Sequence, residues 1–323
     1  MEKLFQKISF TSASLVLALL LGIFTTLFIS AKPAIDEFGL HFLVDKRWNQ
    51  EVPLSNAATP NAALSDTQAD ISDDVISDED DDDMILDEDD EESVDTKTVY
   101  GGLVPIIGTL FSTIIALAFA LPIAMGIAVF LAEIASKNIS KFVGMAIELL
   151  AAIPSIIFGM WGLYYFAPII AEAFGGYQVS LLTAGLVLGV MILPFMAAVT
   201  RDSMNTTPDV LKESAYALGA TKFEVVKDII FPYSKVGIIG SIILALGRAL
   251  GETMAVAFLI GAVYSLPEKI TDPTISIPVA MAVNFGEASG LGESALFYLG
   301  LILFIMSFAI IFIAKFYFLK RVK

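Results

Sequence analysis

Two ionisable residues inside a long apolar stretch are the first candidates for chemistry in this chain. Arg248 and Glu252 stand four residues apart in the run Gly-Arg-Ala-Leu-Gly-Glu-Thr-Met-Ala-Val, so they share one face of a predicted helix and can pair. A charge in the middle of a membrane costs about 2.5–3.5 kcal/mol on insertion scales, and such residues are therefore functional candidates. The guanidinium fork matches an edge of a phosphate or sulfate, and the acid would keep the anion from binding too tightly. The alternative is a self-neutralising couple that faces a neighbouring helix.

Glu148 is a third candidate, because it also lies within an apolar stretch, ahead of Leu-Leu-Ala-Ala-Ile-Pro-Ser. A carboxyl group in such a stretch could contact a charged substrate on its way through a membrane. The alternative is a carboxyl near the end of the span that reaches out to water.

Several other kinds of chemistry lack their residues. The chain has no cysteine, which excludes disulfides, thiolate nucleophiles and cysteine-ligated metals. Its one histidine, His41, lies close to Phe42 and Trp48, as expected of an interfacial residue. No Gly-x-x-x-x-Gly-Lys-Ser/Thr loop occurs, so the chain is not expected to bind or hydrolyse ATP itself. We therefore expect no enzyme and no cofactor.

The composition is that of an integral membrane protein. The mean hydropathy is +0.78 and 56% of the residues are hydrophobic. A transmembrane helix needs about 20 apolar residues. Six stretches meet this length, which predicts an all-α integral membrane protein with six transmembrane helices, at Phe10–Ile29, Val104–Leu131, Phe142–Ala167, Val179–Val199, Val236–Val263 and Ala295–Ala314.

Lysine and arginine in the loops gather on one side of this topology, as the positive-inside rule requires of the cytoplasmic side. That side receives both ends of the chain and the segment between spans four and five, which carries Arg201, Lys212, Lys222, Lys227 and Lys235. Both termini are therefore predicted to be cytoplasmic, and the long loop after the first span to be on the outer side.

The strong negative charge of the chain comes from one insert in that outer loop. Residues 66–95 hold 17 Asp or Glu and no Lys or Arg, and the rest of the chain has 18 acids against 19 bases. Such a block cannot bury apolar surface and is predicted to be disordered. It could bind divalent cations weakly or contact a basic partner, or it could be a solvated tether without a ligand. The Gly-centred spacing of a calcium loop is absent.

The segment Glu213–Pro232 has the pattern of a docking element made of two short helices. Gly219 suits the left-handed backbone that ends the first helix. Thr221 and Glu224 have the Thr-x-x-Glu spacing of a capping box that begins the second, and Pro232 is expected to end it. An ordinary amphipathic connecting loop would carry the same signals.

These motifs resemble a known family. Glu213-Ser-Ala with Gly219 is similar to the Glu-Ala-Ala…Gly loop of bacterial ABC importer permeases, with Ser214 where that family often has Ala. The stretches around Glu148 and around Arg248 and Glu252 resemble the PstC-type phosphate permease subunit, as do Phe42–Asn49 and the Tyr-Gly-Gly-Leu run before Gly-Thr-Leu. The acidic insert departs from the family pattern, so no family function extends to it.

The resemblance implies a type I ABC importer permease fold, with residues 101–315 as the core, 201–235 as a cytoplasmic coupling loop and 316–323 as a cytoplasmic tail. Residues 1–30 would then be the first span and 31–100 a periplasmic loop of a bacterial inner-membrane protein. It also implies a second permease subunit (PstA-like), two copies of an ATPase (PstB-like), a periplasmic phosphate-binding protein (PstS-like) and inorganic phosphate as cargo, with no nucleic acid. Glu213 would orient the coupling helix through local hydrogen bonds, Ala215 would permit close packing and Gly219 would form the corner.

Two other classes of protein remain compatible with the residues. An ion-gradient-driven secondary transporter or channel, or a permease for another oxyanion, could use the same membrane charges. A membrane-anchored interaction protein could act through the acidic loop alone. Uptake that survives ATP depletion while an ion gradient remains would favour the secondary transporter or channel. Loss of function on deleting residues 66–95 would favour the interaction protein.

Overall fold

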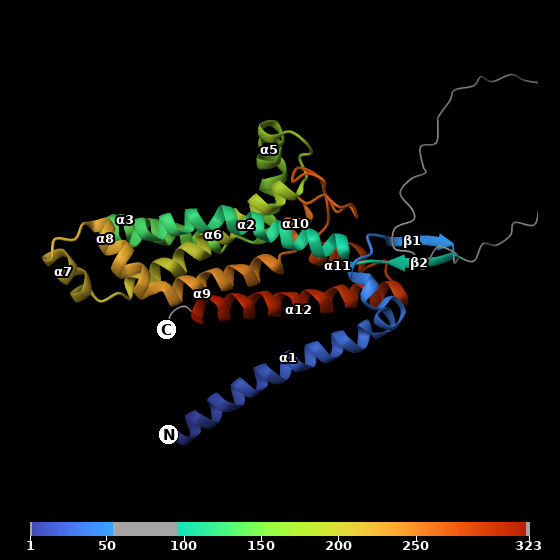
Figure 1. The fold of residues 1–323 in the computed structure, drawn as a ribbon, viewed down its shortest axis with the longest axis horizontal. Helices are drawn as coiled ribbons and strands as arrows, with labels where there is room; N and C mark the ends of the chain where they lie inside the picture. Colours follow the sequence, from blue (N-terminus) through green and yellow to red (C-terminus); the bar gives the residue numbers. More distant parts are fainter. Residues whose placement is uncertain (1, 54–95, 321–323) are drawn as a thin grey trace, which may run out of the picture.

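The computed structural model describes residues 2–53 and 96–320, which form a bundle of long helices with a small two-stranded sheet at one end (Figure 1). The acidic insert at 66–95 lies outside the described residues. The elements in chain order are α1 (Glu2–Phe38), η1 (Gly39–Leu43), β1 (Trp48–Pro53), β2 (Thr96–Tyr100), α2 (Leu103–Val129), η3 (Phe130–Ile134), α3 (Lys137–Ala151), α4 (Ser155–Trp161), η4 (Gly162–Phe166), α5 (Ala167–Phe174), α6 (Leu181–Asn205), α7 (Asp209–Ala217), α8 (Lys222–Val225), η5 (Val226–Ile230), α9 (Phe231–Leu250), α10 (Met254–Ala257), α11 (Ile277–Asn284) and α12 (Leu291–Lys320).

The prediction of six membrane-spanning helices is confirmed, although the limits of the spans differ from the predicted ones and two predicted spans, the third and the fifth, are interrupted. Six helical stretches in the described part of the chain are long and apolar enough to cross a membrane. They are Leu4–Leu43, Leu103–Ile134, Ser155–Phe174, Leu181–Asn205, Lys222–Leu250 and Leu291–Phe316.

The centre of the bundle is the contact between α2 and α6. A Cβ placed on Gly185 would lie 2.7 Å from Ile115 Cβ, and one on Gly189 would lie 3.0 Å from the carbonyl oxygen of Ala116. This Gly-x-x-x-Gly spacing lets the two backbones approach closely, as in many membrane helix pairs. The facing side of α2 has a small residue at every fourth position, namely the buried Ala116, Ala120, Ala124 and Ala128.

The predicted third span, Phe142–Ala167, is interrupted. Helix α3 ends at Ala151 and α4 begins at Ser155, with Pro154 in an extended conformation between them. Proline disfavours a helical conformation in the residue before it, here Ile153, and so breaks the run that hydropathy alone reads as continuous.

The predicted fifth span, Val236–Val263, also ends earlier than expected. Helix α9 stops at Leu250, and Gly251 to Thr253 are not helical. The chain then makes only the short helix α10 before an irregular segment. Such a break inside a membrane bundle is tolerated where other protein or a water-filled cavity satisfies the backbone.

Pro232 does not end a helix, contrary to expectation. Helix α8 continues through η5, a π-helical turn, into α9, whose first turn holds Pro232. Proline has no N–H to donate and its ring crowds the preceding turn. The wider π turn directly before it provides a local change of hydrogen bonding at this point, so the helix runs on.

At the end of the bundle opposite α7, strands β1 and β2 form an antiparallel hairpin that the sequence did not predict (Figure 1). The ring of Trp48 stacks on that of Tyr264 with 5.0 Å between centroids and meets the edge of Tyr100 at 5.2 Å. Lys97 on β2 forms an ion pair with Glu37 at the end of α1. The start of α1 and the end of α12 lie at the α7 end of the molecule.

Candidate functional site

Arg248 and Glu252 stand on either side of the break after α9. Arg248 is in the last turn of α9, where the negative end of the helix dipole favours a cation. Glu252 follows the end of that helix, and its Oε1 accepts a hydrogen bond of 3.2 Å from the backbone N–H of Ala255 in α10. The expectation that the two residues share one continuous helical face is therefore not met, because the helix ends at Leu250.

Arg248 is an exposed residue on the surface of this single chain. Within residues 2–53 and 96–320, no ion pair or hydrogen bond of its side chain is recorded, including any with Glu252. The self-neutralising couple is thus absent from the described chain. A membrane arginine in this position requires a partner beyond the described residues, such as an anion, water or another subunit.

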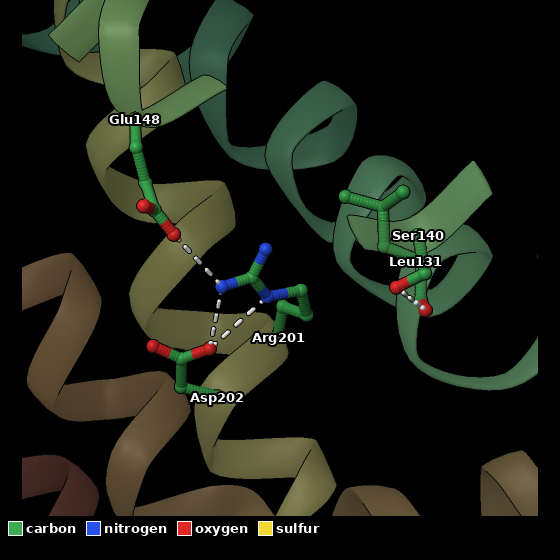
Figure 2. Close-up of polar contacts among 5 residues, drawn as sticks. All are labelled: Leu131, Ser140, Glu148, Arg201 and Asp202. Atoms are coloured by element: carbon green, nitrogen blue, oxygen red, sulfur yellow. Dashed lines mark hydrogen bonds and ion pairs between the residues drawn. The ribbon is translucent and has the colours of Figure 1, made fainter. Parts of the chain in front are cut away.

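Glu148 lies on α3 and contacts a different arginine (Figure 2). Its Oε1 is 3.3 Å from Nη2 of Arg201 on α6, and the same nitrogen is 2.8 Å from Oδ1 of Asp202. The Arg201 side chain is 14% exposed whereas that of Glu148 is 63% exposed. A Cβ on Gly144 would lie 2.1 Å from Arg201 Nη1, so this glycine leaves the room that the guanidinium occupies.

An open pocket of about 550 Å³ adjoins this ion-pair group. Besides Arg201 and Glu148, its lining includes the ammonium-bearing side chains of Lys137 and Lys141. No recorded contact in the described chain brings Glu148 to Arg248 or Glu252. The three residues predicted to share one pathway are thus divided between two places in this chain.

The predicted docking segment has the expected local structure. Helices α7 and α8 are joined at Gly219, whose φ is +89°. Thr221 Oγ1 accepts from the N–H of Glu224, and the Glu224 carboxylate accepts from the N–H of Thr221 at 2.7 Å, which completes the capping box. Apolar side chains of this segment are unusually exposed, with values of 69% for Val210, 91% for Leu218 and 73% for Phe223. Exposed apolar side chains gathered in one segment mark a surface that another protein or the membrane covers.

Ala215 and Glu213 have different surroundings on α7. Ala215 packs against a small apolar cluster built around Met204, Val225 and Ile230. The side chain of Glu213 is exposed, and the structure records no hydrogen bond or ion pair for it among the described residues. The local hydrogen bonds expected of Glu213 are therefore not seen in the isolated chain.

Lys212, the residue before Glu213, makes the contact that the sequence analysis missed. Its Nζ lies 2.7 Å from Oε1 of Glu133 in η3, and the two side chains are 16% and 9% exposed. The residues are 79 positions apart, so no local spacing could have indicated the pair. The signal that the sequence offered for this pair was Glu133 itself, an acidic residue directly after the second apolar stretch.

A family model described as "Binding-protein-dependent transport system inner membrane component" matches residues 120–323 of this chain. The chain belongs to that family. The matched range includes every candidate site residue from Glu148 to Glu252, and the family description agrees with the six membrane-spanning helices in making the chain a multi-pass inner membrane component.

Relatives of this inner membrane component carry a more specific name. A protein of Haemophilus influenzae named "Phosphate transport system permease protein PstC" is 38% identical over 97% of this chain and 92% of its own length. A Pasteurella multocida protein of the same name is 46% identical over 67% of this chain and 74% of its own length.

Solved structures place the fold among type I ABC importer permeases, as expected. The inward-facing MetNI methionine ABC transporter matches with a TM-score of 0.52 and 20% identity, over 67% of this chain and 92% of its own. A bacterial alginate ABC transporter matches with a TM-score of 0.53 and 16% identity, over 68% of this chain and 79% of its own. At these identities the likeness concerns the fold.

Proposed function

We propose that this chain is the permease subunit of an ATP-driven importer that carries inorganic phosphate across the bacterial inner membrane by alternating access. The observation that carries the proposal is the match along nearly the whole chain to a protein named for phosphate transport. The exposed guanidinium of Arg248 supplies the chemistry, because a planar fork of donors suits a tetrahedral oxyanion.

The energy source in this proposal is a separate ATPase dimer of the PstB type. The sequence has no phosphate-binding nucleotide loop, and α7 with its corner at Gly219 has exposed apolar side chains that a partner can cover. Closure of the ATPase pair would displace α7, and the attached helices would switch the pathway between the two sides of the membrane. Glu213 then contributes to the contact with the ATPase, since its carboxylate is free of partners in the described chain.

Arg248 and Glu252 line the pathway in this proposal, together with a second permease subunit of the PstA type. Glu252 accepts a hydrogen bond from the backbone of α10 and forms no ion pair with Arg248 among the described residues, so the arginine is available to the anion. Glu148 belongs to the same pathway at a point nearer α7, beside the cations of Arg201, Lys137 and Lys141. A PstS-type binding protein would deliver phosphate at the opposite end, where the β1–β2 hairpin lies.

The orientation follows from the charges and the arrangement of the ends. The loop cations cluster around α7 and the two chain ends, which lie at one end of the bundle in Figure 1. We assign that end to the cytoplasm because the cytoplasmic loops of membrane proteins carry an excess of Lys and Arg. The hairpin and the acidic insert between its strands would then be periplasmic.

The direct test is to purify the intact four-component complex, reconstitute it, and measure phosphate-dependent ATP hydrolysis with phosphate uptake. Phosphate and its binding protein together should stimulate hydrolysis, and sulfate should not. Stimulation by sulfate instead would make the chain a permease for another oxyanion. Uptake that continues without ATP while an ion gradient is present would make it a secondary transporter.

A further inference from the structure

The coupling helix α7 reaches α2 through side chains alone. The chain itself joins α7 to α6 on one side and, through Gly219, to α8 on the other. One link to that part of the bundle is the ion pair of 2.7 Å between Lys212 Nζ and Oε1 of Glu133 in η3, the π-helical turn that continues α2. Both side chains are largely buried, at 16% and 9% exposed.

The pair lies beside a small apolar cluster in which several elements meet. Its buried members come from α2, α6, α8 and η5, and Ala215 of α7 and Ala132, the neighbour of Glu133, pack against it. Glu133 belongs to η3 and part of the cluster belongs to η5, and both of these are π-helical turns. Such turns occur often at functional positions within helices.

A buried ion pair holds two elements together more firmly than a surface pair. An exposed pair separates readily because water solvates each ion, and its contribution is small. When one partner of a buried pair is removed, the other charge remains in a poorly solvated place. The Glu133–Lys212 pair therefore resists any displacement of α7 away from the end of α2.

We infer that Glu133 and Lys212 are positioning residues that pass the movement of α7 to α2. This rests on the proposed function, in which an ATPase displaces α7. Because α2 packs closely along α6 at Gly185 and Gly189, movement at the end of α2 acts on the centre of the bundle. Without the pair, α7 would move α6 and α9 through the chain but would keep only its apolar contact near the end of α2. ATP would then be hydrolysed with less transport.

The test compares the wild-type complex with Glu133→Gln in proteoliposomes, by phosphate transported per ATP hydrolysed. We expect the variant to assemble with the ATPase and to lower this ratio roughly tenfold, a usual size for coupling between distant sites. The matched control is Asp209→Asn, because Asp209 Oδ1 lies 3.9 Å from the same ammonium but its side chain is 88% exposed. This control should leave the ratio unchanged, since exposed pairs contribute little.

Rescue separates a positioning role from a structural one. Exchanging the charges with Glu133→Lys and Lys212→Glu should restore the ratio. Since the chain has no cysteine, Glu133→Cys with Lys212→Cys gives a second route. In that variant, cross-linking the two cysteines with a short bifunctional thiol reagent should raise the amount of phosphate transported per ATP hydrolysed. The same protein sample is measured before and after the reagent is added.

Either of two results would overturn the inference: an unchanged ratio in Glu133→Gln, or a loss that neither charge exchange nor cross-linking reverses. A wild-type complex that moves no phosphate would refute the proposed function instead. The amount of oxyanion transported per ATP hydrolysed, measured with whichever oxyanion stimulates the ATPase, would then still test the Glu133–Lys212 pair.

Discussion

Arg248 differs from Arg201, the arginine on α6, in forming no ion pair with an acid among residues 2–53 and 96–320. Arg201 is fixed by Glu148 and Asp202, whereas Glu252 directs its carboxylate to the backbone of α10. The same residue type thus serves a structural purpose at one position and stays available at the other. Pairing, more than location, decides which arginine can bind a passing anion.

We predict that Arg248→Gln lowers phosphate uptake by about ten- to a hundredfold while the complex still assembles. A hydrogen bond to a charged group contributes about 1.5–3 kcal/mol, and glutamine removes the charge and the fork. Uptake of labelled phosphate into proteoliposomes measures the effect. Arg248→Lys, which keeps the charge without the fork, should retain intermediate activity. Normal uptake by the glutamine variant would remove Arg248 from the pathway.

Asp45 gives a prediction about stability and pH outside the membrane spans. Burial disfavours its ionised form, but hydrogen bonds from the Arg47 side chain and backbone and the charge of Arg47 outweigh this, so the pKa of Asp45 lies below its ordinary value of 3.8. The stabilisation is therefore complete above pH 3.8 and is lost as the pH falls through the lowered pKa.

We expect Asp45→Asn to destabilise the protein at pH 7 by about 1.5–3 kcal/mol, the contribution of a charged hydrogen bond. Thermal unfolding of both proteins in detergent, measured from pH 7 downward, checks this. The difference between them should shrink only at the acid end of the range. A difference that disappears near neutral pH would show that another group is responsible.

At the scale of elements, the corner between α7 and α8 depends on the backbone of one residue. A Cβ on Gly219 would meet no atom within 4 Å, so its φ of +89° is what restricts the position to glycine. We predict that Gly219→Ala disturbs the corner and weakens association with the ATPase, since the strain is about 1–3 kcal/mol.

Pull-down of the ATPase with tagged permease measures this loss. Gly240→Ala is the matched control, because its Cβ also has open space and its backbone is ordinary. Gly219→Asn should be milder than alanine, as asparagine tolerates the left-handed region better. Equal binding by the alanine variant and the control would contradict the docking role of this corner.

The elements that sequence predicted well are those whose signals are local. Thr221 and Glu224 specify their capping box within four residues, and the length of each apolar run specifies a span. The ion pairs Glu148–Arg201 and Lys212–Glu133 join residues 53 and 79 positions apart. Helical periodicity indicates a face but not which neighbour meets it, so these partners could not be inferred. The break after Leu250 was missed because the apolar run resumes at Met254, directly after the three residues of the break, so hydropathy over the length of a span reads across it.

At the scale of the whole molecule, the acidic insert lies in the sequence between the two strands of the hairpin. Strands β1 and β2 pair from Trp48 with Tyr100 to Pro53 with Thr96, on either side of the insert. The stack of Trp48 on Tyr264 and the ion pair of Lys97 with Glu37 fix the base of the hairpin to the bundle. The contacts described for Arg201, for Glu252 and for the coupling helix are all made by residues outside 66–95.

We predict that deleting residues 66–95 leaves phosphate uptake within about twofold of wild type and makes the folded protein slightly more stable. The deletion shortens the connection between the strands from 42 to 12 residues. The closure cost falls with the logarithm of loop length, by about 0.6 kcal/mol for each halving, so a gain of about 1 kcal/mol follows. Uptake assays and thermal unfolding of the same preparations measure both effects.

A full-length variant with every Asp and Glu of 66–95 changed to Asn or Gln separates the effect of charge from the effect of loop length. It should match wild type in both measurements, because exposed charge is screened beyond about 8 Å at physiological salt. Loss of uptake in both variants would instead make the negative charge of the insert essential and would favour a protein that acts through its acidic loop.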